Sequence, residues 1–235
     1  MDRNIIITCK KCGMPLKKGT KICSYCQRRT GHFAGASKQK PEGAVNIRDG
    51  KIVIPIPWVS LVLILLNTAI GLYKLSGGEA AILARYGMMT GALQKGEWIR
   101  FVASSFLHVS LLHLASNMYA LVIYGFIFEN RIGRGKYLLI YIASILGSAL
   151  LINFIGGSAL HIGASGAIWG LMTANLVYCL KTRRKFLYLL YALFAVAGNA
   201  VYSFAYGVSW QGHLGGAIAG VLMGLLLFSK EGKKE

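Results

Sequence analysis

Acidic residues are scarce in this chain, which has 8 Asp and Glu against 26 Lys and Arg and a formal net charge of +18. Charged residues of both signs make up only 14% of its 235 residues, whereas hydrophobic residues make up 55%. The mean hydropathy is +0.53. So little charge excludes an ordinary soluble domain, and so much apolar surface excludes a disordered chain. The composition favours a membrane protein.

Proline and cysteine are also rare, with four and five residues respectively. Four prolines exclude a collagen-like repeat, and five cysteines exclude a secreted scaffold stapled by disulfides. The excess of basic residues is typical of nucleic-acid binding proteins. Where those cations lie along the chain tests that interpretation.

Six apolar runs are long enough to cross about 30 Å of hydrocarbon, which takes roughly 20 helical residues. They lie at 55–75, 106–128, 136–156, 164–180, 186–206 and 212–229. Of the 26 cations, 22 precede the first run, follow the last or lie in alternate loops. This positive-inside pattern places both termini in the cytoplasm. The sequence therefore predicts an all-α polytopic membrane domain over 53–229, a six-helix bundle with a cytoplasmic tail at 230–235, and it disfavours a nucleic-acid partner.

Two CxxC pairs precede the first span, and they contain Cys9, Cys12, Cys23 and Cys26. Two such knuckles supply the four thiolates of a tetrahedral structural zinc site, and a reducing cytosol disfavours disulfides. The spacing predicts a zinc-ribbon-like head over residues 1–30. A flexible linker is predicted over 31–52, which is rich in Gly, Ala, Ser, Lys and Gln.

The head could serve protein docking, regulation or nucleic-acid contact, or it could simply be a small folded cap. Its basic residues would also suit anionic lipid headgroups. We favour contact with lipid or with a cytoplasmic protein partner.

Four polar side chains interrupt the apolar spans, at His113, Asn117, Ser165 and His213. At 1.5 Å per helical residue, each histidine and the serine lie roughly 24 to 26 Å above the charged residue at the inner end of their own span. Asn117 lies one turn below His113 on the same helix face. All four therefore belong to one layer near the outer face of the membrane. Polar groups at that depth are expensive and indicate function.

A serine and a histidine at one depth form a nucleophile and base if their helices touch. Gly166 and Gly170 on the fourth span, and Gly216, Gly220 and Gly224 on the sixth, are spaced four apart and allow such close approach. Gly163 and Gly166 flank the serine and permit a sharp turn into the helix, whose first N–H groups point toward a developing anion.

Each feature also has an ordinary structural explanation. A membrane serine usually bonds its own helix backbone, a lone buried histidine is often structural, and glycine pairs usually serve packing. Four independent explanations meeting at one depth are less probable than one shared site.

These residues resemble the rhomboid intramembrane serine proteases. The resemblance covers residues 55–229, and three motifs carry it: the Gly-x-Ser-Gly at 163–166; His213 with Gly216 and Gly220; and the series His108, His113 and Asn117. The segment Glu97-Trp98-Ile99-Arg100 is similar to the family's tryptophan–arginine loop motif. Glu129, Arg131 and Gly133 resemble the charged end of its second span.

The resemblance implies an endopeptidase that cuts transmembrane segments of single-span proteins near the outer face, through an acyl-enzyme. Ser165 would be the nucleophile and His213 the base. They would act as a dyad, because both aspartates of the chain precede the first span. His113, Asn117 and the Ser165 N–H would form the oxyanion hole, and His108 would line the entrance. Catalysis would need no metal or ATP, and the protein would lie in a bacterial plasma membrane.

Three residues depart from the family pattern: Ile99 replaces a tryptophan, Trp169 a tyrosine or phenylalanine, and Gly212 an alanine. An indole at position 169 can still stack on the imidazole of His213.

Two other functions are compatible with parts of this pattern. A catalytically dead rhomboid relative would typically lack the serine or the histidine, and both are present. A channel or transporter would need polar residues along both halves of the bundle, whereas the inner half of the spans is almost wholly apolar.

Overall fold

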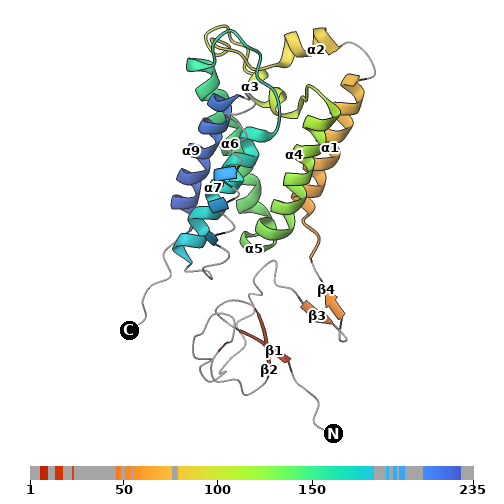
Figure 1. Cartoon of the computed structure of the whole chain (residues 1–235), viewed down its shortest axis with the longest axis vertical. Coiled ribbons are helices and arrows are strands. Elements are labelled where there is room, and N and C mark those ends of the chain that lie inside the picture. The colour runs from red at the N-terminus through yellow and green to blue at the C-terminus, as the bar shows by residue number, and fades with distance from the viewer. Residues whose placement is uncertain are drawn as a thin grey trace.

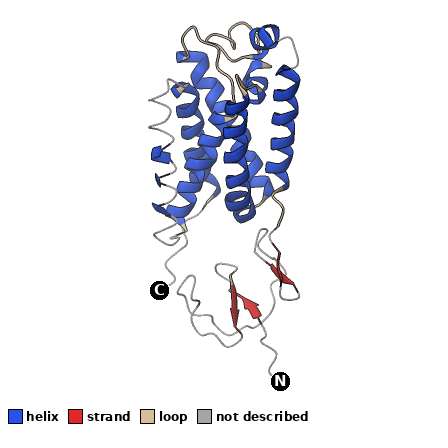
Figure 2. Cartoon of the chain, turned by 45° about the vertical axis from the view of Figure 1, so that its right-hand side comes forward, coloured by secondary structure: helices blue, strands red, loops and turns tan. Residues whose placement is uncertain are grey.

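The computed structural model describes residues 6–9, 14–17, 23, 46–48, 51–53, 55–75, 79–182, 189–190, 193–194, 196–198 and 209–228. The described residues form a bundle (Figure 1) built mainly from long helices. These are α1 (Trp58–Leu75), α4 (Leu111–Tyr124), α6 (Arg134–Ile155), α7 (Ser165–Lys181) and α9 (Trp210–Leu227). Figure 2 shows the same bundle in a second view, coloured by helix and strand.

Short elements complete the described part of the chain. A π-helical turn η2 (Gly125–Glu129) and α5 (Asn130–Ile132) continue α4. The segment before α4 contains α2 (Glu79–Tyr86), α3 (Arg100–Ala103) and the 3-10 turn η1 (Ser104–Phe106). Strands β1 (Ile6–Thr8) and β2 (Pro15–Lys17) form one antiparallel hairpin. Strands β3 (Asn46–Arg48) and β4 (Lys51–Val53) form another.

Five of the six predicted spans contain a described helix, each within a few residues of the predicted bounds. Among the described helices, three are long and apolar enough to cross a membrane, over Leu111–Ile132, Arg134–Ile155 and Trp210–Leu227. The helix over Trp58–Tyr73 is apolar but shorter. The predicted span at 186–206 lies mostly outside the described residues, so six helices stay a prediction.

The predicted linker is not wholly irregular, because β3 and β4 pair within residues 46–53 and Arg48 lies opposite Lys51. In the sequence, Asp49-Gly50 stands between the two strands, and this dipeptide favours two-residue hairpin connections. The linker composition is dominated by residues 31–45, which hid this local hairpin signal. The boundaries of the head and linker remain predictions.

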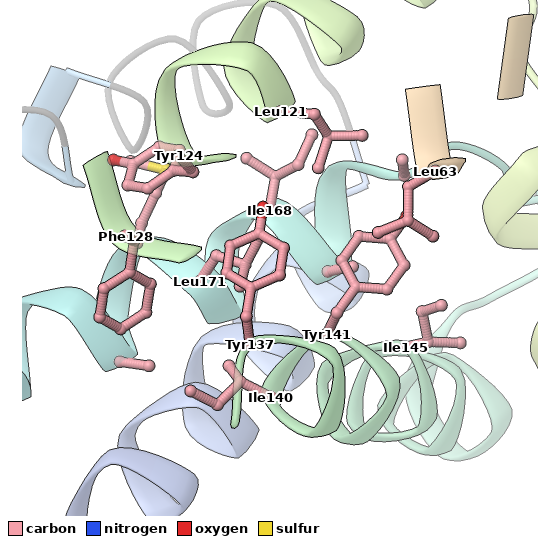
Figure 3. Packing of buried hydrophobic residues seen from close by; sticks show 14 of the residues in the cluster. Leu63, Leu121, Tyr124, Phe128, Tyr137, Ile140, Tyr141, Ile145, Ile168 and Leu171 are labelled. Atoms are coloured by element: carbon pink, nitrogen blue, oxygen red, sulfur yellow. The ribbon is translucent and has the colours of Figure 1, made fainter. Parts of the chain in front are cut away.

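The bundle core lies where α1, α4, α6 and α7 meet (Figure 3). Tyr137 and Tyr141 of α6 are fully buried there, against Leu63 of α1, Leu121 of α4 and Leu171 of α7. Large apolar side chains also cover the outside of the bundle, and Leu112 and Leu226 are 79% and 78% exposed. Such a surface suits a hydrocarbon solvent and would be a liability in water.

Helices α7 and α9 run side by side in the same direction. At their C-terminal ends the Lys181 ammonium donates to the carbonyl oxygens of Leu225 and Phe228, at 2.7 and 2.5 Å. A Cβ placed on Gly216 would collide with the Gly166 carbonyl, and one on Gly220 with the Gly170 carbonyl. The glycines spaced four apart on α7 and those on α9 therefore face each other, as the sequence predicted. We call these two rows the glycine ladders, and they bring the two backbones into contact.

The end of the bundle where α1 begins contains a buried carboxylate. Glu129, which is 2% exposed, accepts hydrogen bonds from the N–H groups of Val59 and Ser60 at 3.0 and 2.8 Å and from the Ser60 hydroxyl at 2.7 Å. An anion at a helix start complements the free N–H groups and the dipole of that helix. Glu129 directly follows the predicted span at 106–128, and the structure shows that its charge is held by the start of another helix.

The segment at 79–106, between α1 and α4, is folded. The guanidinium of buried Arg100 donates to the Gly87 carbonyl at 2.6 Å and forms an ion pair with Glu97 at 2.9 Å. Asn153 at the end of α6 accepts from the Leu93 N–H at 2.9 Å. The segment is therefore fastened to the bundle, with Ile99 exposed at its surface.

Gly216→Ala tests the contact between α7 and α9. The added methyl would push two backbones apart, and overpacking of this kind costs about 1–3 kcal/mol. We expect the midpoint of thermal unfolding in detergent, followed by tryptophan fluorescence, to fall by about 5 °C. Gly135→Ala is the matched control, because that glycine is exposed and a Cβ there meets nothing. Equal midpoints for both variants would contradict the packing described above.

Candidate active site

The side chains of Ser165 and His213 lie in direct contact, with the Ser165 Oγ 2.8 Å from the His213 Nε2. Ser165 is the first residue of α7, and His213 lies in the first turn of α9. Because the glycine ladders begin within one turn of each residue, the same contact that joins the helices brings the hydroxyl to the imidazole. His213 is 8% exposed, and its ring stacks on the Trp169 indole with centroids 5.6 Å apart and planes at 26°.

The loop before Ser165 has the conformation that its glycines allow. Gly163 has φ +122°, which L side chains rarely adopt, and its N–H donates to the Ser104 carbonyl at 3.0 Å. A Cβ on Gly163 would lie 2.8 Å from the His113 ring. Gly166 has no room for a Cβ either, because Ser148 and the Gly212 carbonyl lie against it. Both glycines are therefore required by close packing around the serine.

His113 and Asn117 of α4 face the same space. Together with Ser165, Trp169 and His213 they line a cavity of about 930 Å³. Ser110 is the N-cap of that helix, and its hydroxyl accepts from the His113 N–H at 3.2 Å. The Asn117 amide donates to the His113 carbonyl at 3.0 Å. The structure thus brings the four polar residues of the predicted layer around one cavity.

His108 does not line that cavity, contrary to its predicted place at the entrance. It is 2% exposed, and its ring packs edge-on against His113, with centroids 5.0 Å apart. His108 precedes the first turn of α4, after the extended residue Leu107, so helical spacing from His113 does not describe its direction. His108 therefore packs against the His113 ring and helps to hold it in place.

A second, smaller cavity of about 20 Å³ adjoins the serine. It is lined mainly by small and polar residues, including Ser104, Ser105, Ser148, His161 and Ser209, together with Ser165 and His213. A space of this size holds about one water molecule and offers it several polar partners. Chemistry that needs water next to the serine is therefore compatible with this site.

Sequence reasoning missed two of these residues, His161 and Ser209. Both also line the larger cavity. The available signal was their spacing, because each stands four residues before a member of the contacting pair, Ser165 or His213. The sequence does not say that the two side chains meet.

The four cysteines predicted to bind zinc are described only in part. Cys9 and Cys23 are buried in one small cluster with Leu16, and the Cys9 N–H donates to the Met14 carbonyl at 2.8 Å. Cys12 and Cys26 lie outside the described residues. Within the described part of the chain no group of three metal-binding side chains occurs. Cys179, the fifth cysteine, is buried in α7.

A family model described as the rhomboid domain matches residues 95–230. This chain belongs to the rhomboid family. The rhomboid protease AarA of Providencia stuartii is 31% identical over 200 residues, which cover 71% of each chain. The rhomboid protease GluP of Bacillus subtilis is 32% identical over 78% of this chain, but this chain covers only 36% of that longer protein.

Eukaryotic rhomboids are similar as well. The mitochondrial RHOMBOID-like protein 6 of Arabidopsis thaliana is 32% identical over 64% of this chain and 51% of its own length. The rhomboid-type serine protease 2 of Emericella nidulans is 30% identical over 55% of this chain and 27% of its own. The predicted family is therefore confirmed, and this rhomboid is an integral membrane serine protease.

Trp169→Ala tests the stacked ring of this rhomboid. An aromatic face stabilises a cation held against it by about 0.5–2 kcal/mol, so if His213 gains a proton during the reaction the rate of proteolysis should fall about 2- to 30-fold. Trp169→Phe keeps a stacking face and should retain most activity. Trp58→Ala, at the exposed start of α1, controls for the loss of an indole elsewhere. A Trp169→Ala variant with unchanged kcat would exclude a role for the stack.

Proposed function

We propose that this rhomboid is an intramembrane endopeptidase that cleaves transmembrane segments with a Ser165–His213 dyad. The contact of 2.8 Å between the Ser165 Oγ and the His213 Nε2 carries the proposal. A serine hydroxyl is a weak nucleophile unless an adjacent base accepts its proton. In the resting site the hydroxyl donates to Nε2, so the imidazole proton resides on Nδ1.

The reaction begins when the Ser165 Oγ attacks the carbonyl carbon of the scissile bond and its proton passes to the His213 Nε2. The tetrahedral intermediate then collapses, the C–N bond breaks and His213 returns the proton to the leaving amine. Water next attacks the acyl ester with His213 as base. The ester C–O bond breaks, and Ser165 recovers its proton. The dyad supplies nucleophile, base and acid, so the proposed cleavage uses no metal or ATP.

The negative charge of the intermediate needs hydrogen-bond donors. The Ser165 N–H begins α7 and is among the donors that no intrahelical bond uses. The His113 ring lies against Gly163, which stands two residues before Ser165 in the chain. Asn117 lines the cavity that contains Ser165. We assign the oxyanion hole to these three groups. In an oxyanion hole, the loss of one hydrogen-bond donor typically lowers the rate by about 10²- to 10³-fold.

The proposed substrates are single-span membrane proteins whose helix can unwind near the outer face, with small residues at the cleaved bond. Two observations support this class. The cavity at the dyad is lined by apolar as well as polar side chains, including exposed Leu112 and Trp210. In addition, a peptide bond inside an intact helix is shielded, whereas an extended segment presents its carbonyl to the serine.

We further propose that the protein lies in a bacterial plasma membrane, with both termini in the cytoplasm and the site opening outward. The one-sided distribution of 22 of 26 cations supports this orientation.

The dyad is tested by incubating purified full-length protein in liposomes with a labelled single-span peptide that carries Ala, Gly and Ser near its outer end. Ser165→Ala and His213→Ala are each expected to reduce kcat by about 10³-fold or more. Ser158→Ala is the matched control, because that exposed serine lies in the same loop and outside both cavities. Cleavage by Ser165→Ala at the wild-type rate would exclude the dyad.

For the head we propose a structural zinc ion held by Cys9, Cys12, Cys23 and Cys26. The burial of Cys9 and Cys23 in one cluster beside the β1–β2 hairpin supports the proposal. A metal would also stabilise a segment too short for a core of its own. The basic residues around it are suited to anionic lipid headgroups or to a cytoplasmic protein partner, with nucleic acid disfavoured.

Metal analysis of the purified chain tests the head. We expect about one zinc per chain, and less than a tenth of that for the double variant Cys9→Ser/Cys23→Ser, because two ligands cannot close a tetrahedral site. Cys179→Ser should retain the metal. A metal-free wild-type protein purified without chelator would contradict the zinc site.

A further inference from the structure

One hydrogen-bonded histidine lies between the two elements that carry the dyad. His161 belongs to the loop that leads to Ser165 and is 7% exposed. Its Nδ1 lies 2.5 Å from the Ser209 Oγ, and its Nε2 lies 2.9 Å from the Gly156 carbonyl. The side chain four residues before the nucleophile thus bonds the side chain four residues before the base.

The bonding partners determine which nitrogen of His161 holds the proton. A carbonyl oxygen only accepts, so Nε2 carries the proton and donates it to Gly156. Nδ1 of the neutral ring then accepts from the Ser209 hydroxyl. The Ser209 oxygen keeps a lone pair for the Gly212 N–H, which lies 3.3 Å away. Every polar atom in this short chain of hydrogen bonds has one consistent role.

Both residues that form this series of hydrogen bonds are also held through their backbones. Ser209 is the N-cap of α9, and its carbonyl accepts from the His213 N–H at 3.1 Å. The backbone of His161 pairs with buried Met88 in both directions, at 2.8 and 2.9 Å. The His161 imidazole therefore connects the folded segment 79–106, through Met88, to the first turn of α9, which carries His213.

We propose that His161 is a positioning residue, which holds the first turn of α9 at the height where the His213 Nε2 meets the Ser165 Oγ. The inference rests on the proposed dyad. The glycine contacts join α7 and α9 along their length, but the first turn of a helix frays most easily. A displacement of about 1 Å between nucleophile and base can cost about 10²-fold in rate. The link between His161 and Ser209 opposes that displacement.

Two conservative substitutions separate the bonds of His161. The Oδ1 of an asparagine lies close to the place of Nδ1, so His161→Asn can accept from Ser209 but cannot reach Gly156. The Nε2 of a glutamine lies close to the place of the histidine Nε2, so His161→Gln can donate to Gly156 and loses Ser209. The two variants are thus matched controls in size and polarity for each other.

The test measures kcat and KM for the labelled single-span peptide in liposomes. It also follows the reaction of Ser165 with a fluorophosphonate. In that reaction the Oγ–P bond forms, fluoride leaves and His213 takes the hydroxyl proton, so its rate tests dyad alignment without transmembrane docking. For His161→Gln we expect kcat and the fluorophosphonate rate to fall together about 10- to 100-fold with KM unchanged. His161→Asn should keep at least a third of both rates.

Ser209 provides a second pair of variants. Ser209→Ala should lose as much kcat as His161→Gln, Ser209→Thr should retain most of it, and the double variant His161→Gln/Ser209→Ala should lose no more than the worse single change. Equal losses for Asn and Gln at position 161, or a loss confined to KM, would overturn the inference. The inference would also be overturned if the midpoint of thermal unfolding were so much lower for His161→Gln than for His161→Asn that loss of folded protein explained the lower rate. If Ser165→Ala cleaved at the wild-type rate in the same assay, the dyad itself would fail instead.

Discussion

The backbones of α7 and α9 approach so closely that no Cβ fits between Gly166 and Gly216 or between Gly170 and Gly220. Within a bilayer, helices gain little from burying apolar surface, because lipid tails are equally apolar, and association depends on close packing. The small residues that permit this packing begin beside the serine and one turn after the histidine. The contact between Ser165 and His213 therefore depends on the same feature that joins the two helices.

The remaining polar contacts hold the ends of the bundle around that central contact. At one end of the bundle Glu129 accepts hydrogen bonds from the first N–H groups of α1, and Lys181 donates to carbonyl oxygens at the end of α9. At the opposite end Arg100 and Asn153 bond the folded segment before α4. Unpaired polar groups cost several kcal/mol in hydrocarbon, so each of these bonds is needed where it lies. These bonds hold both ends of the bundle, and the cavity at Ser165 and His213 lies near one of them.

Much of this fold could be predicted from composition and spacing. Long apolar runs predicted the helices, and glycines four apart predicted the contact face, because both signals are local properties of a helix in lipid. The place of His108 could not be predicted from spacing, because it precedes α4 and its ring packs against His113. The hairpin formed by residues 46–48 and 51–53 was missed because linker composition concealed a short local pairing signal. The bonds of Glu129 could not be predicted either, because they reach the start of a helix about 70 residues earlier in the chain.

The sequence by itself predicted which residues lie at one height, because residue spacing along a helix converts directly to depth and the placement of cations predicts how the spans are oriented. That spacing predicted one layer for Ser165, His213, His113 and Asn117, and the motifs around these residues identified the family by resemblance. Only the tertiary structure decided how each helix is rotated about its axis and where the loops run, since those depend on packing and hydrogen bonds between segments far apart in the chain. The bond between His161 and Ser209 joins residues 48 positions apart, and no local pattern specifies it.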